Sequence, residues 1–360
     1  RDADWLADQQ WPLVILDEAQ TLKNPASQMA KSLRDIPATG RVALTGTPLE
    51  NSLQDLWTLI DWVNPGLLGD RKKLTSLFRT PIEKHGDAAS QARLNRRLRP
   101  FLLRRTKEEV AAELPPKTEI LERVDLPKSQ QALYEAVRSA MDERVRKAIA
   151  DRGLARARIT VLDALLKLRQ VCCDPSLVKT KAAKNVSDSA KRERLRALLS
   201  ELVAEGRRVL VFSQFVEMLR LIEDDLNQDG VKSLTLTGST TNRSEVLEAF
   251  SQGDASVFLL SLKAGGVGLT LTEADTVILY DPWWNPAVER QAMDRAHRIG
   301  QDKPVFVHRL VAAGTVEEKI LDMQARKQAL ADALFDKEGG ASETLLDEAT
   351  LQDLFAPLAT

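Results

Sequence analysis

The amino-acid sequence predicts an α/β protein built on doubly wound parallel sheets and divided into more than one domain. The chain has 360 residues, which is enough for two or three cores, because single domains usually run to roughly 100–200 residues. Short apolar runs that close on polar or glycine-containing turns recur along it, as the strands of a covered parallel sheet do. In the C-terminal half, helical stretches separate these runs at the spacing of βαβ units.

Two strand-like runs near the N-terminus predict the first piece of sheet. Residues 13–16 (LVIL) and 42–44 (VAL) are apolar throughout, and polar residues follow each of them. Runs that are apolar on both faces are typical of strands covered by helices on both sides. We therefore expect residues 1–52 to be half of a sheet domain, and we expect a longer chain upstream, because the sequence begins at Arg1 without a methionine.

The middle of the chain is predicted to be mostly helical. Apolar residues recur at helical spacing from Leu53 onward, and we assign residues 53–112 to a first helical protrusion. The stretch Glu-Leu-Pro-Pro at 113–116 is a rigid break. With the strand-like residues after it, the range 113–126 is assigned to the crossing between two lobes, and residues 127–186 to a second helical protrusion.

The last part of the chain predicts a complete doubly wound sheet. Four apolar runs alternate with helical stretches and stand at residues 209–212, 257–260, 276–279 and 305–307. We assign residues 187–315 to this domain. Residues 316–360 are expected to form a brace helix at Val316–Phe335 and a tail with weak structural signals.

Composition describes an ordinary globular protein. Lys plus Arg (51) and Asp plus Glu (52) nearly cancel, so a DNA-binding protein of this composition must gather its cations on one surface. The only cysteines, Cys172 and Cys173, are adjacent, which excludes a disulfide framework and a CxxC metal clamp. No apolar run approaches the ~20 residues that span a bilayer, and no signal peptide is evident. We expect no membrane partner and a cytoplasmic location, or a nuclear one in a eukaryote.

Polar residues that follow the first two predicted strands are candidates for a ligand site. Open parallel sheets bind ligands beyond the carboxyl ends of their strands. Asp17 and Glu18 could hold Mg²⁺ through water and orient an attacking water, although an isolated pair of this kind is more often a solvated acidic turn. Thr45, Gly46 and Thr47 follow the second strand and, taken alone, form a loop.

Two further segments are candidates for phosphate binding. Residues 263–268 (KAGGVG) follow a predicted strand and open a helix, where free N–H groups attract phosphate, but they lack the GxxxxGK[ST] spacing of a Walker A loop. Within residues 291–301, Gln291, Arg295 and Arg298 would share one face of a helix. Two guanidiniums on one face suit a phosphate clamp, and a salt-bridged surface helix is the alternative.

Taken together, eight motifs resemble those of the Swi/Snf-type ATPases of helicase superfamily two, and the DEAQ variant favours a bacterial member. They occur in the order and spacing of that family over roughly residues 11–326. The motifs are DEAQ (17–20), LTGTPLEN (44–51), FLLRRTK (101–107), ELPPK (113–117), VLVFSQF (209–215), AGGVGLTLTEAD (264–275), DPWWNP (281–286) and DRAHRIGQ (294–301). WWNP together with HRIGQ separates this group from the DEAD-box RNA helicases.

The resemblance implies two RecA-like lobes that close on ATP and Mg²⁺, each with a helical protrusion. It implies that Asp17 is the metal-side carboxylate and Glu18 the activator of water, with Gln20 where many members carry His. Arg295 and Arg298 would reach the γ-phosphate, Arg298 as the finger, which can be worth about 10³–10⁵ in rate. The resemblance further implies nucleotide contacts at Gly268 and Gln291, coupling at Thr45, Gly46, Thr47, Trp283 and Trp284, and DNA phosphate contacts at Ser213, Gln214, Gly238, Ser239, Ser261, Lys263 and Gly265.

The activity implied by the resemblance is ATP-driven movement on double-stranded DNA. We expect a monomer that remodels protein–DNA complexes and meets DNA-bound proteins. No Gly-Lys-Thr or Gly-Lys-Ser occurs in the sequence, so residues 1–360 by themselves are expected to hydrolyse ATP negligibly. Two alternatives remain, a non-catalytic DNA-binding or scaffold module and an RNA helicase.

Overall fold

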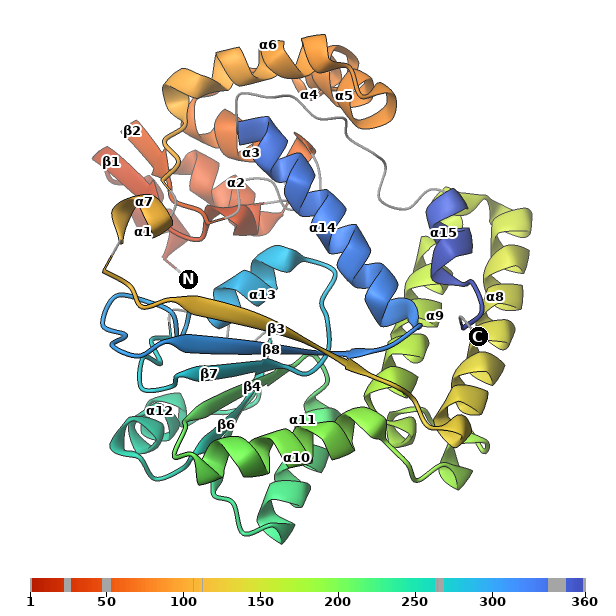
Figure 1. The fold of residues 1–360 in the computed structure, drawn as a ribbon. Coiled ribbons are helices and arrows are strands. Elements are labelled where there is room, and N and C mark those ends of the chain that lie inside the picture. The colour runs from red at the N-terminus through yellow and green to blue at the C-terminus, as the bar shows by residue number, and fades with distance from the viewer. Residues whose placement is uncertain are drawn as a thin grey trace. The chain divides into compact units, whose positions relative to one another are not determined.

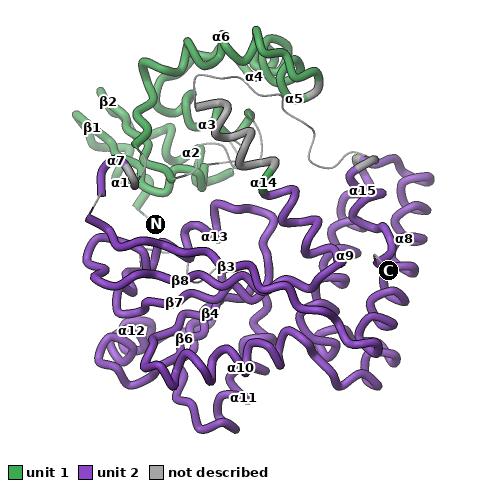
Figure 2. Tube along the Cα trace, in the orientation of Figure 1, with its two compact units in different colours: residues 1–105, 325–345 green, residues 106–324, 346–360 purple. Residues whose placement is uncertain are grey.

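The computed structural model describes residues 2–22, 27–46, 53–105, 107–111, 113–262, 264, 269–335 and 348–358. Two compact units divide the chain, and Figure 2 shows them in different colours. Unit 1 comprises residues 1–105 and 325–345, and unit 2 comprises residues 106–324 and 346–360. Four of the predicted site residues lie outside the described residues, namely Thr47, Lys263, Gly265 and Gly268.

Unit 1 begins with a two-stranded parallel sheet. After the short helix α1 (Ala3–Ala7), the strands β1 (Trp11–Leu16) and β2 (Ala38–Ala43) pair in parallel, and α2 (Gln28–Asp35) lies between them in sequence. Ser27 caps α2, because its side chain accepts a hydrogen bond from the backbone N–H three residues later. β1 contains the apolar run 13–16 that predicted it, whereas β2 begins four residues before the predicted run 42–44 and ends at Ala43.

The described residues cover one face of this sheet. Val14 and Leu16 pack with Trp62 in a small core. Leu13 and Ile15 point to the other face and are 49% and 58% exposed. Neighbouring side chains of a strand point to opposite faces, and the described helices pack on only one of them. The prediction that helices cover both faces is therefore not met within the described part of unit 1.

The rest of unit 1 is helical, as the spacing of apolar residues from Leu53 onward predicted. Trp57, Phe78 and Leu94 are among the buried side chains that form its core. The elements are α3 (Leu53–Val63), α4 (Arg71–Leu74), a π-helical turn (Thr75–Arg79), α5 (Thr80–His85), α6 (Ala88–Leu98) and a 3₁₀ turn (Arg99–Phe101). A glycine in the left-handed conformation, Gly86 with φ of 59°, ends α5.

Unit 2 is built on a six-stranded parallel sheet. The strands are β3 (Lys117–Val124), β4 (Val209–Ser213), β5 (Ser233–Leu236), β6 (Val257–Ser261), β7 (Thr276–Leu279) and β8 (Val305–Ala312). Their order is β3-β8-β7-β4-β6-β5, and every pairing is parallel. Because β4 lies between β6 and β7, the chain changes direction across the sheet there. This is the doubly wound topology that the alternating runs predicted.

Helices cover both faces of the sheet of unit 2 (Figure 1). Val209 and Val211 join the core formed with α10 and α11, whereas Leu210 and Phe212 join the core formed with α12 and α13. The bounds of these helices are Ala190–Ala204 for α10, Val216–Gln228 for α11, Arg243–Gln252 for α12 and Pro286–Met293 for α13. The continuous apolar runs thus correspond to strands that are buried on both sides.

A group of helices at one end of the sheet completes unit 2 (Figure 1). α8 (Lys128–Arg152) and α9 (Leu154–Cys173) pack against each other, and Gly153 with φ of 74° separates them. α14 (Val316–Phe335) covers the residues predicted for the brace helix, and its residues up to Gln324 belong to unit 2. α15 (Glu348–Leu354) joins the core of these helices, so the tail has structure where its sequence showed weak signals. None of the described helices is long and apolar enough to cross a bilayer.

Candidate functional site

The predicted acidic pair lies in the turn directly after β1. The backbone N–H of Glu18 donates a hydrogen bond to Oδ1 of Asp17 at 2.8 Å. Glu18 has φ of 49°, and among the described residues it alone combines a side chain with a positive φ. Such a conformation costs of the order of 1–3 kcal/mol and is found preferentially at functional sites. The strained turn is therefore a feature that a purely structural loop would not need.

Gln20 links this acidic turn to the turn after β2. Its Nε2 donates to the Glu18 carboxylate, and its Oε1 accepts a hydrogen bond from the Thr45 hydroxyl at 2.7 Å. The backbone N–H of Ala19 also donates to the carbonyl of Leu44 at 2.9 Å. A side-chain amide can donate and accept at once, so Gln20 joins the predicted water activator to a predicted coupling residue. The sequence had located Gln20 only as a substitute for His.

The oxygen donors of this turn fit a hard divalent cation. Asp17 is exposed, and carboxylate oxygens are the ligands that Mg²⁺ prefers, usually with several waters retained. Among the residues that the structure describes, no group of three or more His, Cys, Asp and Glu side chains could hold a metal ion. Asp17 is the exposed carboxylate of this turn, and its role as a metal ligand stays a prediction. Gly46 is exposed beside Thr45.

The two predicted arginines lie in turns after α13. The sequence predicted that Gln291, Arg295 and Arg298 share one helical face, and this is wrong because α13 ends before the arginines. The carbonyl of Arg295 accepts a hydrogen bond from the N–H of Leu271 at 2.9 Å, a tertiary contact in place of a helical one. Buried Arg295 donates from Nη1 to the carbonyl of Leu269 at 3.0 Å. Exposed Arg298 lies 3.3 Å from the Thr270 hydroxyl, so it is the better placed of the two to reach a bound anion.

Hydrogen bonds join the turn that carries Arg295 and Arg298, called the arginine turn, to the segment that precedes β3. Lys107 begins the short helix α7 (Lys107–Val110), and its Nζ donates to Oδ1 of Asp294 at 2.5 Å and to the carbonyl of His297 at 2.9 Å. Nε2 of His297 lies 2.8 Å from the carbonyl of Pro115. Sequence reasoning did not single out these contacts, although each residue lies in one of the recognised motifs. These contacts, all within unit 2, fix Asp294 just before Arg295 and His297 just before Arg298.

The predicted DNA contacts of unit 2 differ in exposure. Gly238 and Ser239 are exposed in the turn after β5. Ser213 and Ser261 end β4 and β6 and are buried. The Ser213 hydroxyl donates to Oδ1 of Asp281 at 2.6 Å, and Ser261 accepts from a backbone N–H three residues later at 3.3 Å. Contact of these two hydroxyls with DNA stays a prediction, since both have partners inside the protein.

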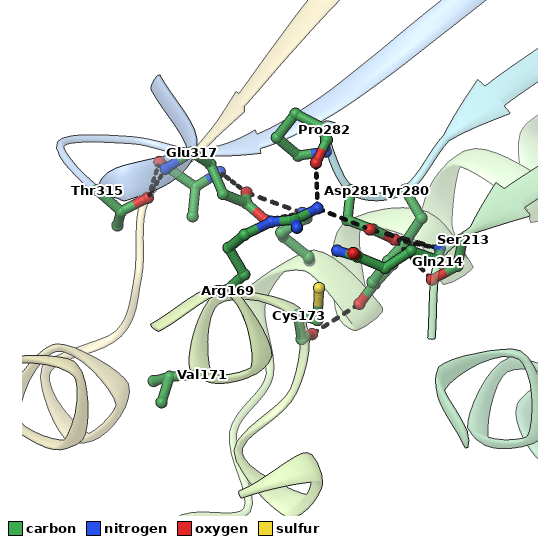
Figure 3. A network of polar contacts seen from close by, with 12 residues as sticks. Arg169, Val171, Cys173, Ser213, Gln214, Tyr280, Asp281, Pro282, Thr315 and Glu317 are labelled. Atoms are coloured by element: carbon green, nitrogen blue, oxygen red, sulfur yellow. Dashed lines mark hydrogen bonds and ion pairs between the residues drawn. The ribbon is translucent and has the colours of Figure 1, made fainter. Parts of the chain in front are cut away.

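A buried arginine that the sequence did not single out organises the loops after β4 and β7 (Figure 3). Arg169 comes from α9, and its Nη2 donates to the carbonyl of Pro282 and lies 3.5 Å from Oδ2 of Asp281. The same carboxylate accepts hydrogen bonds from the Ser213 hydroxyl and, at 3.3 Å, from the backbone N–H of Gln214. Arg169 and Asp281 therefore hold two loops and a helix of unit 2 at one point.

Trp283 and Trp284 pack around this arginine. The Cζ atom of Arg169 lies 5.5 Å from the ring centroid of Trp283, 5.8 Å from that of Trp284 and 6.0 Å from that of Phe215. These distances allow cation–π attraction. The backbone N–H of Trp283 donates to buried Glu289 at 2.6 Å. The half-buried tryptophans thus pack against Arg169, and their part in coupling stays a prediction.

A second buried ion pair joins α10 to α14. Nζ of Lys191 lies 2.9 Å from both carboxylate oxygens of Glu317, and neither side chain is exposed. Burial by itself lowers the pKa of Lys191, but the charge of Glu317 outweighs it and raises that pKa. Burial also raises the pKa of Cys172 and Cys173, the last two residues of α9.

The doubly wound parallel sheet, the acidic turn after a parallel strand and the arginine turn are features of helicase-type proteins with a RecA-like fold. The comparison with known families makes the assignment specific. Residues 1–177 match the SNF2-related domain, and residues 190–300 match the helicase conserved C-terminal domain. The chain belongs to the SNF2 family, as the motifs indicated.

Individual relatives agree with this assignment. The putative ATP-dependent helicase/translocase YwqA of Bacillus subtilis is 38% identical over 100% of this chain and 39% of its own length. Human SWI/SNF-related matrix-associated actin-dependent regulator of chromatin subfamily A member 1 is 38% identical over 91% of this chain and 32% of its own length. The solved SWI2/SNF2 ATPase core of Sulfolobus solfataricus in complex with dsDNA is 33% identical, with a TM-score of 0.55 over 99% of this chain and 75% of that chain. The chain thus spans about two fifths or less of these curated relatives, and its RecA-like fold is confirmed.

Proposed function

We propose that this chain is part of an ATP-driven motor that moves along double-stranded DNA and remodels protein–DNA complexes. Membership of the SNF2 family supports a helicase or translocase type of activity. The relative solved in complex with dsDNA supports the choice of duplex DNA. The observation that carries the proposal is the presence in one chain of both a strained Glu18 turn and an exposed Arg298 turn.

The roles proposed for the residues follow from their chemistry. Asp17 would hold Mg²⁺ through water, and Glu18 would orient and deprotonate the attacking water. Gln20 holds the Glu18 carboxylate and ties it to the turn after β2. Arg298 would stabilise charge on the transferred phosphoryl group, the task of an arginine finger. Bound ATP supplies the phosphoryl group whose hydrolysis drives movement.

The wider setting of the motor follows from the same proposal. It acts as a monomer, holds DNA through the phosphate backbone with the exposed turn at Gly238 and Ser239, and displaces or shifts proteins that lie in its path. Contacts to phosphates carry no sequence information and can be released at each step. We place it in the bacterial cytoplasm at the nucleoid, or in the nucleus of a eukaryote.

Steady-state ATPase assays test the proposal with two proteins. One is residues 1–360 alone, and the other carries a segment with a GKT loop ahead of residue 1. We expect negligible turnover by the first, because the β- and γ-phosphates lack the lysine and N–H cradle of that loop. The second should be stimulated by duplex DNA and should lose this activity on Glu18→Gln or Arg298→Ala. Robust DNA-stimulated turnover by residues 1–360 alone contradicts the expected inactivity.

The same assay separates the alternatives. A non-catalytic scaffold predicts that the extended protein binds DNA and hydrolyses no ATP. The chemistry of the site argues against a scaffold, because a scaffold does not need an acidic pair in a strained turn together with an exposed arginine. An RNA helicase predicts that single-stranded RNA stimulates turnover more than duplex DNA does, and that outcome would remove duplex DNA as the proposed track.

A further inference from the structure

The helical part of unit 1 holds a concentration of positive charge that the near-neutral composition hides. Between residues 70 and 105 the sequence has eleven Arg and Lys and only three Asp and Glu. Residues 88–105 contain six arginines and no acidic residue. This is the local gathering of cations that a DNA-binding protein of balanced charge needs.

The helix α6 presents three of these arginines on one face. Arg93, Arg96 and Arg97 are exposed and stand at spacings of three and four residues, so their side chains are neighbours on the helix surface. Arg99 follows in the next turn and is also exposed. Leu94 on the opposite side is buried in the core of unit 1. We call Arg93, Arg96, Arg97 and Arg99 the α6 arginine row.

The row has no ion-pair partner within the described residues. Arg93 donates to Oγ of Ser90 at 2.8 Å, and Arg97 lies 5.6 Å from the ring centroid of Phe78. Asp87 is a carboxylate near the row, and its pKa is lowered by a hydrogen bond from Ser90 and by the charge of Arg93, without an ion pair to that arginine. No carboxylate of the described part of the chain forms an ion pair with any of its four members. On α8, α10 and α11, by contrast, several arginines are paired with carboxylates.

An unpaired row of this kind is unfavourable in the isolated protein. Like charges three or four residues apart on a helix repel by roughly 0.2–0.5 kcal/mol per pair. The repulsion is relieved when a polyanion binds and releases its counterions. The planar guanidinium also holds phosphate through two parallel hydrogen bonds, which a lysine cannot do. The composition of the row therefore matches a phosphate backbone better than a surface kept only for solubility.

We propose that the α6 arginine row is a contact surface for the phosphate backbone of duplex DNA, additional to the DNA contacts predicted on unit 2. The proposal builds on the proposed function and adds a binding surface to it. Arg93 and Arg97 stand about 6 Å apart along the helix axis, so each can reach a different phosphate. The apolar face of α6 is buried in unit 1, which leaves no apolar face to enter a membrane.

The test measures binding of a fluorescently labelled duplex DNA to residues 1–360 without nucleotide, by anisotropy over a range of KCl concentrations. The variant is Arg93→Gln/Arg96→Gln/Arg97→Gln. Each phosphate contact contributes about −0.9 to the slope of log K against log salt. If the three arginines each hold a phosphate, the slope becomes less negative by about 2.7, and affinity at low salt falls by roughly tenfold or more. AT-rich and GC-rich duplexes should be affected alike.

A matched control removes the same charge from unit 2. Arg144→Gln/Arg146→Gln/Arg220→Gln eliminates three exposed arginines that are paired with carboxylates. This variant should keep the wild-type slope, and Arg93→Lys/Arg96→Lys/Arg97→Lys should keep most of it, because the charge remains. Thermal melts of all three variants check folding. If the α6 glutamine variant and the unit 2 control give equal slopes, the proposal is overturned.

Two further outcomes are informative. If the α6 glutamine variant loses affinity for single-stranded RNA and keeps its affinity for duplex DNA, the row is an RNA surface and the proposal is wrong. The proposed motor function fails separately, when duplex DNA does not stimulate hydrolysis by the protein extended with a GKT segment. Binding without nucleotide and DNA-stimulated hydrolysis are thus independent tests of the two ideas.

Discussion

Replacing Lys191 by Met should destabilise unit 2 strongly while leaving its surface unchanged. The substitution removes the cation that lies 2.9 Å from both carboxylate oxygens of Glu317. The Glu317 carboxylate then keeps its hydrogen bond from the backbone N–H of Ala312 at 2.9 Å. A fully buried carboxylate without its counter-charge is the costly state, since desolvation of the ion is no longer offset.

The size of the effect follows from the burial of the pair. Both side chains are 0% exposed, and removing one partner of a buried ion pair typically costs about 3–5 kcal/mol. For a unit of this size, 1 kcal/mol corresponds to roughly 2–4 °C in Tm, so we expect a decrease of about 6–20 °C. The double variant Lys191→Met/Glu317→Gln should recover most of this loss. It buries no charge, and the Gln carbonyl can still accept the hydrogen bond from Ala312.

The dependence of stability on pH distinguishes loss of the ion pair in Lys191→Met from loss of packing. Burial raises the pKa of Glu317 above its usual value of 4.5, and removing Lys191 removes the charge that opposes this rise. A raised folded-state pKa means that stability is highest below the unfolded-state pKa and falls as pH rises from that value through the folded-state pKa. The deficit of Lys191→Met against wild type should therefore be smaller near pH 5 than near pH 8.

Native-state hydrogen exchange of amides in β7 and β8 measures this deficit directly in unit 2. The ion-pair reasoning is refuted if the single variant loses less than about 1 kcal/mol. It is equally refuted if the double variant is as unstable as the single one, or if the deficit does not change with pH.

Two other predictions concern the arginine turn and the sheet edge. In the protein extended with a GKT segment, Lys107→Met should lower kcat by about 10- to 100-fold with little change in KM for ATP, because Lys107 positions the arginine turn. Lys107→Arg should restore part of the lost kcat. An unchanged kcat in Lys107→Met contradicts this prediction. Burial alone would raise the pKa of Glu122, but hydrogen bonds from His308 and Arg194 outweigh it and lower that pKa, so its stabilisation is present above about pH 4.5 and is lost as pH falls. Glu122→Gln should reduce the loss of Tm below that pH, and parallel curves for both proteins would disprove the effect.

The sheet of unit 2 could be predicted because its information is local. β4, β6 and β7 are runs of mostly apolar residues that are buried on both faces, and the polar residues that end each run mark the edge where ligands bind. The half-buried strand β5 has no such run and was not predicted. The helical regions were equally legible from the spacing of residues such as Leu53 and Trp57. The start of α14 at Val316 could also be read from the sequence.

The interactions that organise the site could not be predicted in this way. Arg169 is buried beside Asp281, which lies 112 residues further along the chain. No pattern in either segment predicts this contact. The end of α13 before Arg295 likewise depends on a hydrogen bond from Leu271 in a distant loop. Helical periodicity predicted a longer helix there because a local sequence pattern contains no information about tertiary hydrogen bonds.

Two sets of contacts in unit 2 lie on either side of α13. Before α13, Arg169 contacts Asp281 and Pro282 in the loop after β7. After α13, Lys107 contacts Asp294 in the arginine turn. Between them lies α13, which Asn285 caps at its N-terminus by accepting a hydrogen bond from a backbone N–H.

α13 has eight residues and is about 12 Å long. The loop held by Arg169 also carries the contacts to Ser213 and Gln214, which belong to the predicted DNA surface. The loop after β7, α13 and the arginine turn therefore form one continuous segment of unit 2 that leads from the proposed DNA contacts to the proposed finger, Arg298.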